Sequence, residues 1–192
     1  MILTPSKMEP LYRKAPDFNL LDVVTNEEIT LKEMQSDIAT IIMFICNHCP
    51  YVKHILDVLV ALTHDYLPKG ISFIAINSND VEAYPEDSPK EMQKLAKKKN
   101  FCFPYLFDFT QKVAHSYGAA CTPDFFVFDK EMRCVYRGQF DDARPGNHNP
   151  VTGKDLSEVL DCLLAGKSVN IDQHPSLGCN IKWKNSELTP AH

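Results

Sequence analysis

Three things that the 192-residue sequence lacks narrow its possible functions. No stretch reaches the ~18 consecutive apolar residues of a membrane-spanning helix, and residues 1–14 contain no apolar core of a signal peptide. Positive charge is not in excess, because 25 acidic residues outnumber 20 Lys and Arg residues, for a formal net charge of -5. The excess of positive charge that is typical of a protein that binds nucleic acid or an anionic membrane is therefore missing. We expect a cytoplasmic protein with neither of these as a partner.

Repeats, low-complexity tracts and paired metal-binding motifs are also missing. A second Cys-x-x-Cys or a His-x₃-His pair, which would complete a tetrahedral metal site, does not occur. With 44% hydrophobic and 23% charged residues, the composition is that of an ordinary globular protein with a buried core. We expect one domain over residues 15–166, an N-terminal extension over 1–14, and a C-terminal tail over 167–192 that packs on the domain.

Cysteine, in contrast, is plentiful. The seven cysteines are an odd number, so they cannot all pair within one chain. In a reducing compartment a Cys-x-x-Cys motif indicates redox chemistry or metal binding more often than a permanent disulfide. Cys102, Cys134 and Cys162 lie among apolar residues, and we expect them to be buried as small hydrophobic side chains.

The Cys-Asn-His-Cys motif at residues 46–49 is the most informative stretch, because it lies where a strand turns into a helix. Residues 40–45 are apolar and rich in strand-forming side chains, which predicts a buried strand. Residues 52–66 carry apolar side chains at helical spacing. Free N–H groups at the start of that helix should lower the pKa of Cys46 below its usual ~8.5. Cys49, one turn deeper, can then attack a mixed disulfide formed at Cys46.

The rest of the chain predicts a mixed sheet. Residues 71–77 form a second buried strand, so the motif lies in a strand–helix–strand unit whose two strands are parallel. Residues 124–129 and 133–137 predict an antiparallel hairpin. Further helices are expected over residues 89–99, 110–117 and 153–165.

Several segments resemble a known family. Residues 15–20 (Ala-Pro-Asp-Phe-Asn-Leu), 41–66 and 122–126 (Thr-Pro-Asp-Phe-Phe) are similar to the alkyl hydroperoxide reductase/thiol-specific antioxidant (AhpC/TSA, redoxin) superfamily. Within it the chain most resembles a peroxiredoxin-like group with a thioredoxin-type Cys-x-x-Cys, which the segments at 75–80, 138–145 and 178–184 also resemble. The resemblance implies an α/β, thioredoxin-like fold with a central mixed sheet, helices on both faces, an N-terminal β extension and a C-terminal tail.

The resemblance also implies an activity. Cys46 would be the exposed nucleophile, and Cys49 the resolving cysteine, of a thiol–disulfide oxidoreductase in cell redox homeostasis. The Thr122–Pro123 bond would be cis and face the two cysteines. Backbone of Thr122 could then pair with a substrate chain as an added strand. Expected partners are protein or small-molecule thiols and disulfides, and an external reductant of the thioredoxin or glutathione type, with no cofactor.

His48 precedes the second cysteine, as in the motifs of oxidising disulfide enzymes. Its imidazole can donate a hydrogen bond to the Cys46 thiolate and, when protonated, adds favourable charge. Because a stabilised thiolate favours the reduced form, we expect a reduction potential above the roughly -270 mV of thioredoxin. An uncoupled, solvent-exposed His48 is the alternative. Asn47 carries no equally clear signal.

Two further cysteines could join this chemistry. Cys121 lies just before the predicted cis-proline loop, where either burial or a redox role is possible. Cys179 follows Gly178 in the tail, where it could act as a resolving cysteine or anchor the tail against the body. The sequence leaves both questions open.

A thiol peroxidase acting on peroxides is the first alternative function. Peroxiredoxins surround the attacking cysteine with Pro-x-x-x-Thr-x-x-Cys, but counting back from Cys46 gives Met43 and Ala39 at the threonine and proline positions. The hydroxyl that helps to activate the O–O bond is therefore missing there. Arg137 or Arg144 would have to supply the guanidinium that orients the peroxide.

A metal-binding or copper-chaperone module is the second alternative. It would use Cys46, Cys49 and either a histidine or Met43 as ligands. His115 and His148 are isolated in the sequence, so we assign no metal site.

Two polar segments complete the candidates. Asp141, Asp142 and Arg144 form a charged turn, for which we expect a salt-bridge network, with a proton relay or a docking edge as alternatives. The 77–80 segment, with Asn77, Asn79 and Asp80, ends the second buried strand. Ligands bind at this edge in doubly wound sheets, so its loop should border the active site.

Overall fold

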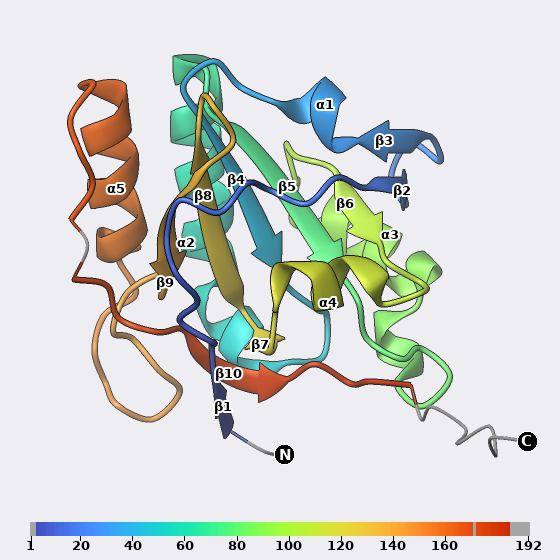
Figure 1. Ribbon diagram of the computed structural model, residues 1–192. Coiled ribbons are helices and arrows are strands. Elements are labelled where there is room, and N and C mark those ends of the chain that lie inside the picture. The colour runs from blue at the N-terminus through green and yellow to red at the C-terminus, as the bar shows by residue number, and fades with distance from the viewer. Residues whose placement is uncertain (1–2, 171, 185–192) are drawn as a thin grey trace, which may run out of the picture.

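The computed structural model, which describes residues 3–170 and 172–184, is built around a seven-stranded mixed sheet (Figure 1). In the order in which they lie side by side, the strands are β3 (Glu28–Thr30), β2 (Asn19–Asp22), β6 (Tyr105–Phe107), β5 (Ser72–Asn77), β4 (Ala39–Phe44), β8 (Asp124–Asp129) and β9 (Cys134–Gly138). Strand β4 runs parallel to β5 and antiparallel to β8, so the predicted strand–helix–strand unit and hairpin are both confirmed.

Strand β4 crosses the middle of the core. All six of its residues are buried, as a strand with covered faces on both sides requires. Ile41 and Met43 point into one apolar cluster, whereas Ile42 and Phe44 point into the other. Each such side chain contributes about 1.5–3 kcal/mol through burial, so the sheet holds the end of β4 firmly in place.

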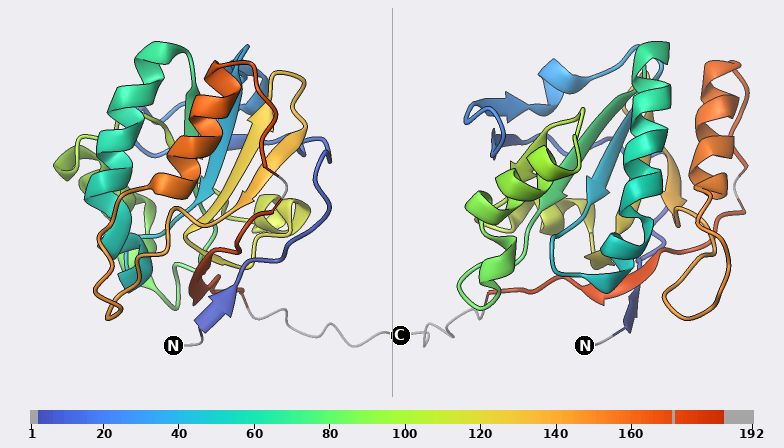
Figure 2. Two further views of the ribbon diagram at one scale, coloured as in Figure 1. Left: turned by 90° about the vertical axis from the view of Figure 1, so that its left-hand side faces the viewer. Right: turned by 180° about the vertical axis from the view of Figure 1, so that it is seen from behind.

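Helices cover both faces of the sheet, as expected. The face seen from behind in Figure 2 is covered by α2 (Pro50–Tyr66), α3 (Pro89–Lys98) and α5 (Lys154–Leu164). The opposite face carries the short helices α1 (Leu31–Met34) and α4 (Lys112–Tyr117). Two 3-10 turns, η1 (Leu67–Lys69) and η2 (Pro85–Asp87), complete the helical elements of the described residues.

A second, three-stranded sheet joins the two ends of the chain. Strand β10 (Leu177–Asn180) lies between β1 (Leu3–Pro5) and β7 (Cys121–Thr122), and both pairings are antiparallel. In Figure 1 this small sheet lies below the carboxyl end of β4. It therefore brings the C-terminal segment to the end of the molecule at which the Cys-Asn-His-Cys motif begins.

The cysteines outside the motif are not all buried. Cys134 is buried as expected, but Cys102 is exposed and Cys162 is half-buried. The expectation for Cys102 was wrong because the residue lies in the irregular segment between α3 and β6. Within residues 3–170 and 172–184, no helix is both long and apolar enough to cross a membrane.

Candidate redox-active site

The motif cysteines lie at the junction of β4 and α2. Strand β4 ends at Phe44, and α2 begins at Pro50 with Cys49 as its N-cap residue. Cys49, and not Cys46, therefore faces the free N–H groups of the first helical turn. Our expectation that the helix would lower the pKa of Cys46 was wrong, because the helix begins four residues after that cysteine.

Both motif cysteines are covered. The exposed fraction of Cys46 is 1% and that of Cys49 is 0%. The exposed nucleophile that the resemblance implied is therefore not present in this arrangement. Cys46 Sγ lies 3.3 Å from the Thr122 hydroxyl and 3.9 Å from Nδ1 of His48, so the cis-proline loop and the histidine close the sulfur off.

A third cysteine completes the cluster. Cys179 Sγ lies 2.9 Å from Cys49 Sγ, and its exposed fraction is 1%. The pKa of Cys49 is lowered to about 5, because hydrogen bonding with the Cys46 and Cys179 sulfurs and with the N–H of Val52 outweighs its burial. As a thiol, Cys49 donates to the Thr122 carbonyl at 3.1 Å and to Cys179. Burial and the neighbouring Cys49 raise the pKa of Cys46, so the cluster holds its negative charge on Cys49.

His48 is paired with a residue that the sequence did not reveal. Its Nδ1 lies 2.5 Å from Oδ2 of Asp87, a fully buried carboxylate in η2. We had expected the imidazole to donate its hydrogen bond to Cys46. Its main hydrogen bond goes to Asp87 instead. The hydrogen bond to Asp87 raises the pKa of His48. Burial alone would raise the pKa of Asp87, but the hydrogen bonds from His48 and Asn79 hold it below its usual range.

The loop after β5 holds Asp87 in place. Asn79 Nδ2 donates to Oδ2 of Asp87 at 2.7 Å, and Asn77 Nδ2 donates to the Asp87 carbonyl at 3.0 Å. The Asp80 N–H donates to the carbonyl of Lys182, and this bond ties the loop to the C-terminal segment. These contacts place the loop beside the Cys-Asn-His-Cys motif.

Asn47 holds the motif in place through three hydrogen bonds. Its N–H donates to Oδ1 of Asp87 at 2.8 Å, and its side-chain oxygen accepts a hydrogen bond from Tyr105 at 3.1 Å. Its amide nitrogen donates to the carbonyl of Glu86. These bonds fix the turn between Cys46 and α2.

Replacing Asp87 by Asn should lower the pKa of His48 toward its ordinary ~6.5, because the charged acceptor that stabilises the imidazolium is removed. An NMR titration of the His48 ring measures the shift. Glu86→Gln is the matched control, since its side chain is exposed and next to Asp87 in the chain. An unchanged His48 pKa in Asp87→Asn would show that Asp87 does not control the charge of His48.

Three side chains of the site carry atoms that could bind a metal ion. Ligand atoms of Cys46, His48 and Asp87 all lie within 4.8 Å of one another, which is the composition of a mixed thiolate, imidazole and carboxylate site. However, the Asp87 carboxylate already accepts hydrogen bonds from the N–H groups of Asn47 and His48, from Asn79 and from the His48 ring. Its oxygens are saturated, and no lone pair is left for a metal. The side chain set therefore fits a hydrogen-bonded network better than a metal centre.

The other proposed ligands lie elsewhere. Met43 is fully buried within β4 and belongs to the apolar core. His115 stacks on Trp183 with a ring separation of 4.1 Å, and His148 is exposed in the loop before α5.

The Thr122–Pro123 peptide bond is cis, as the resemblance implied. The backbone beside it is not open to a substrate, however. Cys179 of β10 pairs with Thr122 of β7, so the chain's own C-terminal segment occupies the edge that we had expected a substrate strand to use. The expectation of an open edge was wrong, because the tail forms a strand there.

Gly178 allows β10 to lie this close. A Cβ atom added to Gly178 would lie 2.0 Å from the carbonyl oxygen of Thr122, far inside van der Waals contact. Gly178→Ala should therefore push β10 away from the cis-proline loop and uncover Cys49, which Cys179 of β10 contacts. If the closed arrangement weakens by ~1.4 kcal/mol, iodoacetamide should alkylate Cys49 about tenfold faster. Gly166→Ala is the control, since nothing lies near its added Cβ and the strain of its φ of +67° falls after α5, away from β10; equal alkylation rates in both variants would contradict the packing role of Gly178.

The comparisons with known proteins place this chain in a family. A model of the AhpC/TSA family matches residues 11–137. The chain belongs to the AhpC/TSA family. An uncharacterized conserved protein from Geobacillus kaustophilus is 55% identical, with a TM-score of 0.95 over 97% of this chain and 98% of that one. No match was found among the curated proteins.

Two solved structures with lower identity share the thioredoxin-like fold. A thiol:disulfide interchange protein from Chlorobium tepidum is 16% identical, with a TM-score of 0.62 over 81% of this chain and 99% of that one. The peroxidoxin BcpB of Mycobacterium tuberculosis is 18% identical, with a TM-score of 0.61 over 82% of this chain and 98% of that one. At this identity they establish the thioredoxin-like fold alone.

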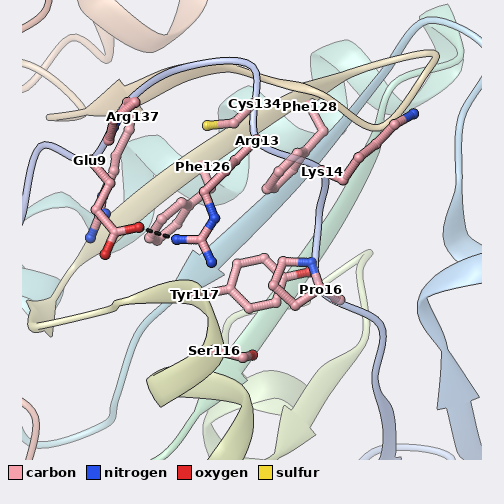
Figure 3. Close-up of a pocket in the computed structure, with 11 residues that line it drawn as sticks. Glu9, Arg13, Lys14, Pro16, Ser116, Tyr117, Phe126, Phe128, Cys134 and Arg137 are labelled. Carbon is pink, nitrogen blue, oxygen red and sulfur yellow. Dashed lines mark hydrogen bonds and ion pairs between the residues drawn. The ribbon is translucent and has the colours of Figure 1, made fainter.

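Arg137, one of the two arginines considered for orienting a peroxide, makes its contacts elsewhere. It is buried, donates to the Gly118 carbonyl at 2.7 Å, and lies over the Phe126 ring. Figure 3 shows its side chain in a hollow lined also by Glu9 and Arg13, which form an ion pair. None of the partners found for Arg137 among the described residues is a motif cysteine.

Arg144 lies nearer to the cis-proline loop. With Tyr51, Pro123 and Leu177 it lines a small hollow beside β10. Its guanidinium donates to the Asp141 and Ala143 carbonyls, both at 2.6 Å, and no ion pair joins it to Asp141 or Asp142 among the described residues.

The expected salt-bridge network in this turn was wrong. The Asp141 carboxylate instead accepts hydrogen bonds from the N–H groups of Ala143, Thr152 and Gly153. The Asp141 carboxylate accepts these bonds because the loop before α5 turns back over it. The loop thereby brings N–H groups that would otherwise be unpaired to the carboxylate oxygens.

Cys121 is buried beside the cluster. Its exposed fraction is 0%, and its thiol donates to the Pro123 carbonyl at 3.6 Å. Burial raises the pKa of Cys121 strongly, so it is a poor nucleophile. Of the two interpretations that the sequence left open, burial is the one that these contacts favour.

Proposed function

We propose that this protein is a thiol–disulfide oxidoreductase in which Cys46 attacks the substrate and Cys49 resolves the mixed disulfide. One observation carries the proposal: Cys46 and Cys49 meet at the start of α2 and both face Thr122 of the cis-proline loop, 3.3 Å from its hydroxyl and 3.1 Å from its carbonyl oxygen. The lowered pKa of Cys49 and the raised pKa of Cys46 favour one thiolate and one thiol in this pair, which is the ionisation state that disulfide exchange requires.

The reaction begins with a proton transfer within the pair. The proton of Cys46 passes to the Cys49 thiolate, and the Cys46 thiolate attacks one sulfur of the substrate disulfide. The leaving thiolate takes the proton from Cys49 and departs as a thiol. Cys49, again a thiolate, attacks the Cys46 sulfur and releases the second thiolate, so that the substrate is reduced and a Cys46–Cys49 disulfide remains. An external dithiol then reduces this disulfide, or two molecules of glutathione do so when the substrate is a disulfide other than oxidised glutathione.

The substrate class follows from what covers the site. An extended polypeptide would need the backbone edge of Thr122, which β10 occupies. A small disulfide needs only access to Cys46, and the half-buried His48 is the side chain beside that sulfur. We therefore propose small-molecule disulfides as the preferred substrates while β10 is in place.

The reduction potential should lie above the roughly -270 mV of thioredoxin. The cause differs from the one that the sequence suggested: hydrogen bonds to the Cys49 thiolate, not a bond from His48 to Cys46, stabilise the reduced form. Equilibration in glutathione redox buffers, followed by acid quench and alkylation, measures this potential. A value at or below that of thioredoxin would contradict the prediction.

Reduction of oxidised glutathione and of insulin tests the proposed function. We expect the wild-type protein to reduce oxidised glutathione faster than insulin, and Cys46→Ser to lose both activities. Cys102→Ser is the matched control, because that thiol is exposed and far along the chain from the motif. Activity that persists in Cys46→Ser would show that it does not arise at Cys46.

Peroxide reduction is a second candidate function. Met43 replaces the threonine of the peroxiredoxin pattern, but the Thr122 hydroxyl lies 3.3 Å from Cys46 Sγ and offers a hydroxyl from another strand. A peroxidase would keep its first step without Cys49. Rapid peroxide consumption that survives in Cys49→Ser and vanishes in Cys46→Ser would favour this function over disulfide exchange.

A further inference from the structure

The cluster holds a third thiol that the two-cysteine cycle does not use. Cys179 comes from β10, more than one hundred residues along the chain from the motif, and its sulfur lies 2.9 Å from that of Cys49. Thr122 pairs with it on one side, and Leu3 of β1 pairs with it on the other. Two strand pairings therefore hold the Cys179 thiol against Cys49.

We propose that Cys179 is a third redox-active cysteine that takes the disulfide over from Cys46 by pairing with Cys49. This inference rests on the proposed function, which supplies the Cys46–Cys49 disulfide. The bond would form within one chain, between the N-cap of α2 and the strand that lies on the cis-proline loop.

The exchange needs no further oxidant. Burial and the neighbouring Cys49 raise the pKa of Cys179 to about 12, so Cys179 must lose its proton as it attacks Cys49 Sγ. A Cys49–Cys179 bond forms as the Cys46–Cys49 bond breaks, and Cys46 leaves as a thiolate. The proton that Cys179 loses is taken up by Cys46. No electrons are gained or lost, so the protein stays oxidised while its disulfide moves.

The geometry favours Cys179 over the other buried thiols. Closing the 2.9 Å gap to the about 2.05 Å of a disulfide needs a movement of about 1 Å. Cys121, the other cysteine beside the cis-proline loop, donates to the carbonyl of Pro123 instead. Cys134 donates to the carbonyl of Tyr136 in β9.

The transfer has two consequences for the site. It returns Cys46 to the thiol form while the oxidising equivalent is stored between two buried sulfurs, which an external reductant reaches only through the reverse exchange with Cys46. It also fastens β10 covalently to the start of α2, which keeps the edge of Thr122 closed in the oxidised protein.

Peptide mapping of the oxidised full-length protein tests the inference. Trypsin leaves Cys46 and Cys49 together on residues 33–53 and places Cys179 on residues 168–182. A Cys46–Cys49 bond is therefore a loop within one peptide, whereas a bond to Cys179 links two peptides. After equilibration in glutathione buffers and acid quench, we expect the linked pair in the wild-type protein, with Cys46 alkylated.

Cys46→Ser then identifies the partner of Cys179. Treated with diamide, this variant should form the same linked pair, which can only contain Cys49. The linked pair should be lost in Cys179→Ser and kept in Cys121→Ser, the matched buried control.

The possible failures are distinguishable. A wild-type protein that turns over disulfides and forms the loop within 33–53, but never the linked pair, would overturn the role of Cys179 and leave the proposed function standing. Cys46→Ser protein in which Cys179 stays fully alkylatable after diamide treatment would count against it equally. Disulfide turnover that persists in Cys46→Ser would contradict the proposed function itself and, with it, this inference.

Discussion

Cys49→Ser should turn the protein from a catalyst into a trap for its substrate. Cys46 can still attack a disulfide, but no thiolate at the α2 N-cap is left to resolve the product. We expect turnover of oxidised glutathione to fall by at least about 1,000-fold, in line with the loss of an essential group from other covalent mechanisms. One glutathione should remain attached to Cys46, which intact-protein mass spectrometry detects.

Cys46→Ser is the comparison for this experiment. It should lose turnover to the same extent but carry no glutathione at residue 46. A glutathione adduct on Cys49 in Cys46→Ser, together with none in Cys49→Ser, would reverse the roles of the two cysteines. Sustained turnover in Cys49→Ser would show that resolution does not depend on the motif.

Arg137→Met should destabilise the protein by about 3–5 kcal/mol at pH 8. Arg137 and Asp124 are both buried, and Arg137 Nη2 lies 3.5 Å from Oδ2 of Asp124. Removing the arginine leaves a carboxylate in the core without a cation. Urea unfolding at a series of pH values measures the loss, and Arg137→Met with Asp124→Leu is the control variant, which should recover much of the stability.

The loss should depend on pH in a defined direction. Burial raises the pKa of Asp124 to about 7, although Arg137 lowers it. Because the folded state then binds more protons than the unfolded state, whose carboxyl titrates near ~3.9, the contribution of Asp124 to stability falls as pH rises from about 4 to 7. Without Arg137 this pKa rises further, so Arg137→Met should cost less at pH 5 than at pH 8. An equal loss at both values would contradict the charge-based explanation.

Local sequence patterns were sufficient to predict the centre of the fold. The apolar run of β4, the helical spacing of α2 and the turn between β8 and β9 each specify their element without distant contacts. Strand β10 was missed for the opposite reason. It has four residues, one of them Gly178, and it becomes a strand only through its pairing with β1 and β7.

In the candidate site too, local sequence predicted some features, and others depended on distant contacts. The motif and the cis-proline sequence predicted where Cys46, Cys49 and Thr122 meet, but not Asp87, which lies 39 residues from His48 in the chain and reaches it through the fold of η2. The burial of Cys46 could not be predicted either, because it depends on Thr122 of the cis-proline loop, which lies 76 residues away in the chain. The location of the thiolate depended on the helix start, which a difference of a few residues moves from one cysteine to the other.

Reaction of the wild-type protein with one equivalent of oxidised glutathione, followed by acid quench and thiol mapping, tests disulfide exchange at the motif most directly. We predict that each chain loses a pair of thiols of which Cys49 is one, that both halves of the substrate are released as glutathione, and that Cys102 stays fully alkylatable. If Cys46 and Cys49 both remain alkylatable while oxidation is confined to other cysteines, the motif is not the site of disulfide exchange.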